Sequence, residues 1–185
     1  MGDMKTGGQT IVQELAAVME RIDSGECEAL CGAILAARRI FLAGAGRSGL
    51  VVRAFAMRLM HLGLAAYVCG ETTTPGAAEG DLLLIVSGSG ETGGLPAAAK
   101  KAKSMGCRLA LITVRRQSTI GELADYIVQV PAPTPKAEHG FRSIQPMGAL
   151  FEQSCLLLLD AAVMRLMERM DVDEAAMYAR HANLE

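Results

Sequence analysis

The feature that most constrains the fold is a series of short apolar runs that alternate with helical segments between residues 39 and 130. The run DLLLIV at 81–86 is the clearest of them and predicts a buried strand. The other runs lie at 39–43, 65–68, 109–114 and 127–130. Because strands that alternate with helices form βαβ units, and buried parallel strands are apolar throughout, we expect a five-stranded parallel sheet in a three-layer α/β/α fold.

Helical periodicity and loop signals complete this outline. Two N-terminal helices are expected within 9–37, ahead of an α/β core at 39–130. Helices inside the core are expected at 48–62, at 92–105 and, as a short turn, near 118–124. The segment 131–145 contains three prolines and predicts a long loop, and C-terminal helices with a tail follow at 146–185. A chain of 185 residues suits one compact domain, so we expect a single domain over 1–185.

Two turns rich in glycine and serine stand directly between a predicted strand and a predicted helix. They are GAGRSG at 44–49 and SGSGET at 87–92. Glycine lets the backbone approach a ligand, the helix N-terminus offers unpaired N–H groups, and the hydroxyls add donors. Because parallel strands end at one edge of the sheet, we expect a single site there for the phosphate of a small phosphosugar. The residues expected to bind it are Gly46, Arg47, Ser48, Ser87, Gly88, Ser89, Gly90, Glu91 and Thr92.

Two other interpretations of these turns stay open. Either turn alone could be a tight turn with a helix cap and no ligand. The turn at 44–49 also satisfies G-x-G-x-x-G, and Glu71 follows where the acid that binds the ribose of a dinucleotide is expected, roughly 20 residues on. Three features argue against dinucleotide binding. They are the two helices before the first strand, the separate serine cluster at 87–92, and the lack of room for a substrate domain.

Composition excludes several function classes. The net charge is −2 with no basic stripe, and four Phe, three Tyr and no Trp leave little for nucleic-acid bases to stack on. No uncharged apolar run approaches the roughly 20 residues of a membrane span. The five cysteines include no C-x-x-C pair, and Cys27 and Cys31 lack further ligands nearby. We therefore expect reduced thiols in a cytoplasmic protein, with no metal, no nucleic-acid partner and no membrane contact.

Six segments carry a more specific signal. They are GAGRSG at 44–49, MRLMHLG at 57–63, GETTTP at 70–75, SGSGET at 87–92, QPMGALFEQ at 145–153 and RHANLE at 180–185. In these segments the chain resembles the sugar isomerase (SIS) domain family, whose fold is flavodoxin-like, and within it the 6-phospho-3-hexuloisomerase family. The resemblance extends over nearly the whole chain.

This resemblance implies an activity and partners. The activity is the interconversion of D-arabino-hex-3-ulose 6-phosphate and D-fructose 6-phosphate in the ribulose monophosphate pathway, directly after hexulose-6-phosphate synthase condenses formaldehyde with ribulose 5-phosphate. The resemblance implies no cofactor. It also implies a homo-oligomer, most often a tetramer, with sites near the subunit interfaces. Two alternatives stay open: another phosphosugar aldose–ketose isomerase, or a non-catalytic sugar-phosphate sensor.

Moving a carbonyl between C2 and C3 requires a base that removes a proton beside the carbonyl and gives a 2,3-enediol. Glu152, in QPMGALFEQ, is the candidate base, and its apolar neighbours Leu150, Phe151 and Leu156 are expected to raise the pKa of its carboxyl. The alternative is a solvated residue in the first turn of a helix, where a carboxylate complements the helix dipole. The resemblance favours the catalytic role.

Two histidines are candidates for moving protons between the sugar oxygens. His61 ends an apolar helix, where a histidine is commonly a core or helix-end residue, and His181 lies in the tail, from which it could close over its own or a neighbouring subunit's site. Thr73 could contact sugar hydroxyls or make local turn bonds, and His139 is left unassigned. The helix expected over 149–170 is apolar on most of its circumference, which predicts a subunit interface.

Overall fold

A computed structural model describes residues 3–133 and 142–184 of the chain. Its five strands are β1 (Ile40–Gly44), β2 (Ala66–Val68), β3 (Leu82–Val86), β4 (Arg108–Thr113) and β5 (Tyr126–Gln129). All four neighbouring pairs are parallel, in the order β2-β1-β3-β4-β5. This order is the flavodoxin-like one and differs from the dinucleotide-binding order, in which the third strand is outermost. The predicted five-stranded parallel sheet is confirmed.

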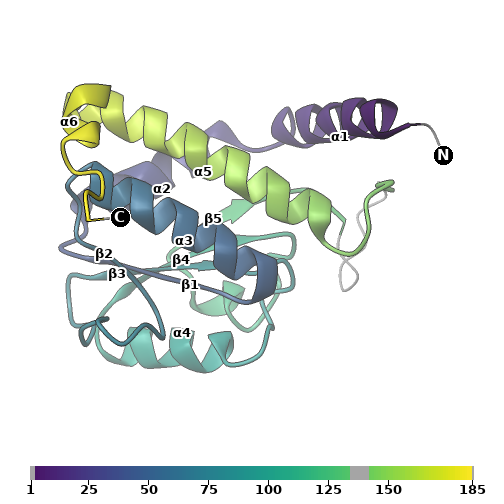
Figure 1. Ribbon diagram of the computed structural model, residues 1–185. Helices are drawn as coiled ribbons and strands as arrows, with labels where there is room; N and C mark the ends of the chain where they lie inside the picture. The colour runs from purple at the N-terminus through teal and green to yellow at the C-terminus, as the bar shows by residue number, and fades with distance from the viewer. Residues whose placement is uncertain (1–2, 134–141, 185) are drawn as a thin grey trace.

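Helices cover both faces of the sheet, which gives the three layers (Figure 1). The helices are α1 (Met4–Met19), α2 (Ser24–Ala36), α3 (Gly46–His61), α4 (Leu95–Ser104), α5 (Ala149–Met170) and α6 (Glu174–Tyr178), with a short 3₁₀ helix η1 (Gly121–Leu123). Ile40 and Leu42 of β1 pack into one core with α2, α3 and α5, and Phe41 and Ala43 pack into the other with α4. This alternation follows from the two-residue period of a strand.

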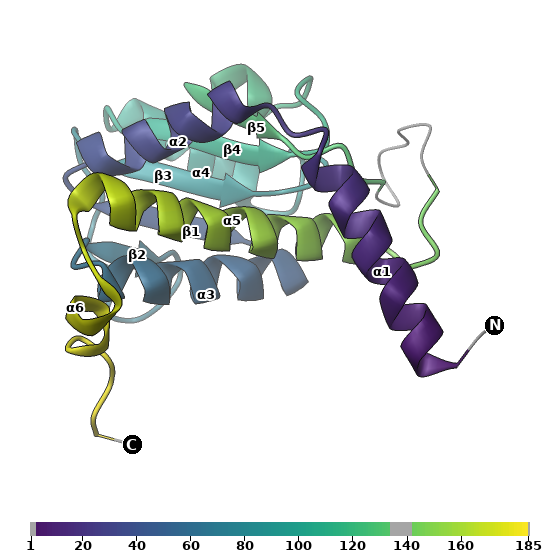
Figure 2. The ribbon, with the colours of Figure 1, turned by 90° about the horizontal axis from the view of Figure 1, so that it is seen from above.

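Several helix boundaries differ from those expected. The first helix begins at Met4 rather than at residue 9, because the Asp3 carboxylate caps it by accepting from the N–H of Thr6 at 2.8 Å. The second helix is likewise capped by Asp23. The helix expected at 92–105 begins only at Leu95, after Gly93 takes a positive φ of 50°. Figure 2 shows that α1 extends outward from the layered body.

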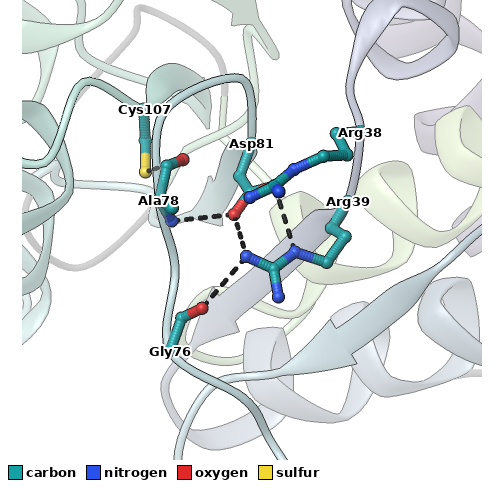
Figure 3. A network of polar contacts seen from close by, with 6 residues as sticks. All are labelled: Arg38, Arg39, Gly76, Ala78, Asp81 and Cys107. Carbon is teal, nitrogen blue, oxygen red and sulfur yellow. Dashed lines mark hydrogen bonds and ion pairs between the residues drawn. The ribbon is translucent and has the colours of Figure 1, made fainter.

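A buried carboxylate ties together the amino-terminal edge of the sheet (Figure 3). The Asp81 side chain, fully buried just before β3, accepts hydrogen bonds from Arg38 Nε at 3.2 Å, from Arg39 Nη2 at 2.6 Å and from the Ala78 N–H at 2.8 Å. Arg39 also donates to the carbonyl of Gly76. Burial alone would raise the pKa of Asp81, but the bonds from Arg39, Ala78 and Arg38 together lower it. This network joins the start of β1 to the loop that enters β3.

The five cysteines are free thiols. Burial raises the pKa of Cys107, whose thiol donates to the carbonyl of Ala78 at 3.2 Å, beside the Asp81 network (Figure 3). In the ranges 3–133 and 142–184 we find no cluster of three or more His, Cys, Asp or Glu side chains suited to a metal ion. Within the same ranges no helix is long and apolar enough to cross a membrane.

We expect Asp81→Asn to lower the free energy of unfolding by about 2 kcal/mol at pH 7, because a hydrogen bond to a charged group contributes about 1.5–3 kcal/mol. The folded-state pKa of Asp81 lies below its unfolded value. Its contribution is therefore present above about pH 4 and is lost as the pH falls through the folded-state pKa. Thermal unfolding of both proteins at pH 7 and pH 3 should show the difference shrinking in acid. Glu122→Gln, which changes an exposed carboxylate, is the control, and equal stability of Asp81→Asn and wild type at pH 7 would contradict the account.

Candidate functional site

The two glycine–serine turns lie side by side at the carboxyl edge of the sheet. The register of β1 and β3 pairs Gly44 with Val86, so both turns leave the sheet at the same level, on strands about 4.8 Å apart. A side chain at Gly44 would place its Cβ 2.9 Å from the backbone of Ser48. Gly46 has a φ of 55°, which favours glycine, and opens α3. The first turn therefore closes tightly and holds Ser48, buried, in the first turn of α3.

Hydroxyl groups converge in the second turn. Ser87 Oγ and Ser89 Oγ lie 3.1 and 3.2 Å from Thr92 Oγ1. Ser87 Oγ accepts from the N–H of Gly90, and Ser89 Oγ accepts from the N–H of Glu91. Because each hydroxyl can reorient its hydrogen, these three can present donors together to an anion. The structure thus brings together Ser87, Ser89 and Thr92, as the sequence predicted.

The loop after β4 holds this turn in place, a contribution that the sequence analysis missed. Gly88 O accepts from the Val114 N–H and from Thr113 Oγ1, both at 3.1 Å. The Glu91 carboxylate accepts from the Thr119 N–H at 2.6 Å, and this bond lowers the pKa of Glu91. The Glu91 side chain is therefore engaged with the neighbouring loop. No spacing in the sequence indicates these contacts, because they join turns that follow different strands.

Glycine is required at position 90 for two reasons. Its φ is 66°, and a Cβ there would lie 2.0 Å from Ser118 Oγ. Gly93 has a similar φ of 50° but faces open space, with nothing within 4 Å of a built Cβ. The close packing of Gly90 against Ser118 thus distinguishes two glycines that look alike in the sequence.

Arg47 and Glu152 form an ion pair beside these turns, with Arg47 Nε 2.8 Å from Glu152 Oε2. Glu152 lies in the first turn of α5, and its side chain is 19% exposed. Its neighbours Leu150 and Phe151 are buried in the core, and Leu156 is exposed. The carboxylate therefore faces a guanidinium rather than the apolar surroundings that the sequence suggested. Arg47 thus pairs with Glu152 and not with Glu71, which is ion-paired with Arg53.

The two candidate histidines lie together but at the other end of α3. The rings of His61 and His181 stack with centroids 5.4 Å apart, and Arg180 Nη1 donates to the carbonyl of His61. His61 is 3% exposed, and its pKa is lowered by burial, by Arg58 and by His181. The 13 residues from Ser48 to His61 correspond to about 20 Å of helix, so one chain does not bring this histidine pair to Glu152. His139 lies outside the described residues.

Two neighbouring hollows share Arg53, one at the carboxyl ends of β1 and β2 and the other along α3 and β2. One, of about 230 Å³, is lined by Gly44, Gly46, Leu50, Arg53, Cys69 and Leu95. The other, of about 400 Å³, is lined by Arg53, Met57, Tyr67, Glu71, Thr73 and Thr74. Within it Glu71 is ion-paired with Arg53. Glu71, the acid that a bound dinucleotide would require, thus has a cationic partner. Thr74 Oγ1 donates to the Val68 carbonyl, which is a local turn bond.

Comparison with known proteins gives a consistent result. Residues 33–157 match the SIS domain family. The chain is 47% identical over 176 residues to the 3-hexulose-6-phosphate isomerase of Bacillus subtilis, with 95% of each chain covered. It is 42% identical to that of Mycobacterium gastri, with 100% of this chain and 94% of the relative covered.

A solved structure agrees with these relatives. It is a hypothetical protein of Methanococcus jannaschii, for which a function as 3-hexulose-6-phosphate isomerase was inferred. It superposes with a TM-score of 0.85 at 33% identity, covering 97% of this chain and 99% of the other. The chain therefore belongs to the SIS domain family and, within it, to the family of the 3-hexulose-6-phosphate isomerases.

Proposed function

We propose that the protein is a 3-hexulose-6-phosphate isomerase, which interconverts D-arabino-hex-3-ulose 6-phosphate and D-fructose 6-phosphate. The observation that carries the proposal is a carboxylate, Glu152, beside a hydroxyl-lined turn in a chain up to 47% identical to enzymes of that name. The turn suits the substrate's phosphate, and the carboxylate suits the proton transfer that the reaction needs.

The phosphate binds at the carboxyl edge and does not react. Ser48, Ser87, Ser89 and Thr92 supply hydroxyl donors, and the strand register holds them on adjoining turns. The binding energy of the phosphate orients C2 and C3 against the base. Thr73, in the hollow of about 400 Å³, contacts sugar hydroxyls.

Glu152 acts as the base. It removes the proton from C2 of the 3-ketose, the electron pair forms the C2–C3 double bond, and a proton from an acid reaches O3, which gives the 2,3-enediol. Removal of the O2 proton and return of a proton to C3 then yields the 2-ketose. In the free site the Arg47 guanidinium is ion-paired with this carboxylate. When the phosphate dianion binds on the adjoining turns, it draws the Arg47 guanidinium toward itself and leaves Glu152 free to act.

The acid comes from a second copy of the chain. His61 and His181 form a stacked pair that can move protons between O2 and O3, but within one chain they lie at the far end of α3. The outer faces of α3 and α5 expose large apolar side chains that a second copy would cover. They are Leu50, Met57, Met60, Leu156, Leu157 and Met164. A homo-oligomer built on this face accounts both for the apolar surface and for the distance to the histidines.

The proposed place in metabolism follows from the substrate. The protein consumes the product of hexulose-6-phosphate synthase, as the resemblance implies. A cytoplasmic location stays a prediction, and the five free thiols support it, because reduced thiols persist in reducing compartments.

A coupled assay tests the function. Hexulose 6-phosphate generated from formaldehyde and ribulose 5-phosphate by a synthase should be converted to fructose 6-phosphate by the purified protein, read out through glucose-6-phosphate isomerase and dehydrogenase. Arabinose 5-phosphate and sedoheptulose 7-phosphate, tested in parallel, should be poor substrates. No fructose 6-phosphate would overturn the proposal, and faster turnover of another phosphosugar would favour the alternative isomerases.

Glu152→Gln tests the base. The amide keeps the shape of the side chain but cannot accept a proton from carbon, so kcat should fall about 10²- to 10⁴-fold while KM changes little. Glu168→Gln makes the same substitution at an exposed position of the same helix and should leave kcat unchanged. Near-normal turnover of Glu152→Gln would place the base elsewhere.

Gly90→Ala and Gly93→Ala form a matched pair that tests the phosphate turn. Both add a methyl group at a positive φ, but only the methyl at position 90 meets Ser118 Oγ. We expect the affinity for fructose 6-phosphate, measured by calorimetry, to fall at least 10-fold in Gly90→Ala and about 2- to 3-fold or less in Gly93→Ala. Equal losses in the two variants would show that the packing of the turn on Ser118 does not matter for binding.

A further inference from the structure

A buried carboxylate on α1 has no part in the mechanism above. Glu14 is 8% exposed, although the exposed side chains around it place most of α1 in solvent. Its Oε2 accepts from Ser143 Oγ at 2.7 Å and from Gln145 Nε2 at 3.1 Å, and its Oε1 accepts from the Ile144 N–H at 2.8 Å. These partners lie about 130 residues further along the chain and lead directly into α5 (Figure 2).

The three bonds define the role of this carboxylate. Its partners are all donors, so it acts purely as an acceptor, as an ionised carboxylate does. Ser143 Oγ in turn accepts from the Gln145 N–H at 3.0 Å, which closes the segment on itself. Burial alone would raise the pKa of Glu14, but the bonds from Ser143, Ile144 and Gln145 lower it. A shortened side chain at this position would leave these partly buried donors without their shared acceptor.

The segment that Glu14 holds runs into a strained turn just before the base. Met147 has a φ of 58°, a left-handed conformation that is unfavourable for a residue with a side chain. Its side chain is 79% exposed, so packing of that side chain does not impose the conformation. The turn is fixed instead by its two ends. On one side are the bonds to Glu14, and on the other the Glu152 N–H donates to the Gly148 carbonyl in the first turn of α5.

We infer that Glu14 is a positioning residue for Glu152. By holding residues 143–145, it sets where the turn begins, and the turn sets where α5 starts and where the Glu152 carboxylate meets Arg47. The inference rests on the proposed function, in which Glu152 is the base. A shift of about 1 Å in a catalytic group can cost about 100-fold in rate, so a contact that never touches the substrate can govern turnover.

The test combines kinetics with amide hydrogen exchange on Glu14→Ala, Glu14→Gln and the exposed neighbour control Gln13→Ala. We expect Glu14→Ala to lower kcat about 10- to 100-fold with KM within about 3-fold, at a temperature well below its unfolding midpoint. Glu14→Gln should recover part of the loss, because its amide oxygen can still accept from the Ile144 N–H. Exchange at the first turn of α5 should be faster in Glu14→Ala, with the second half of α5 unchanged.

These readouts separate the inference from the proposed function. A wild-type protein without isomerase activity would overturn the proposed function, and the exchange data would still decide whether Glu14 fixes the start of α5. Wild-type kcat and wild-type exchange in Glu14→Ala would overturn the inference, as would equal effects in Gln13→Ala. Should Glu14→Ala not fold, Glu14→Gln carries the same test, with an expected fall in kcat of about 3- to 10-fold.

Discussion

The parallel pairing of β1 with β3 is the contact on which the rest of the site depends. Because Gly44 lies opposite Val86, two turns that are 43 residues apart in the chain leave the sheet together. Every other feature of the site is placed relative to this pair. Ser48 and Arg47 come from the first turn, and the hydroxyl cluster comes from the second. The Asp81 network fixes the opposite ends of the same two strands, so the register is held at both edges of the sheet.

The electrostatics of the site fit a base that is restrained until substrate binds. In the free site the exposed Arg47 side chain is ion-paired with the half-buried Glu152 carboxylate. A guanidinium that can reach either a carboxylate or a phosphate couples binding of the unreactive phosphate to the reactive end of the substrate. In the proposed reaction, the charge of the enediol forms beside groups that can exchange protons.

How much of this could be predicted from the sequence depended on whether the signal was local. The strands and the hydroxyl cluster were predictable, because each is encoded by consecutive residues. An apolar run predicts a buried strand, and the glycines and serines that follow it predict a turn. The burial of Glu14 was not predictable, because its hydrogen-bond partners lie about 130 residues away in the sequence. Within its own helix it looks like any other polar residue. The requirement for glycine at 90 depends on Ser118, and the partner of Glu152 turned out to be Arg47 rather than the apolar neighbours adjacent to it in sequence. Nor did the sequence show that Glu152, in α5, lies beside the first turn of α3, whereas His61 lies at the other end of α3.

The most direct test of the account is the fate of the hydrogen on carbon during isomerisation in D₂O, followed by NMR spectroscopy. We predict that the carboxyl group holding the abstracted proton exchanges it with solvent while the enediol is bound, so that deuterium enters C3 of fructose 6-phosphate and C2 of the hexulose 6-phosphate as they equilibrate. Incorporation should be slowed in Glu152→Gln in proportion to kcat. Full equilibration of the two sugars without any deuterium at either carbon would contradict this account, in which the proton passes through a carboxylate that exchanges with solvent.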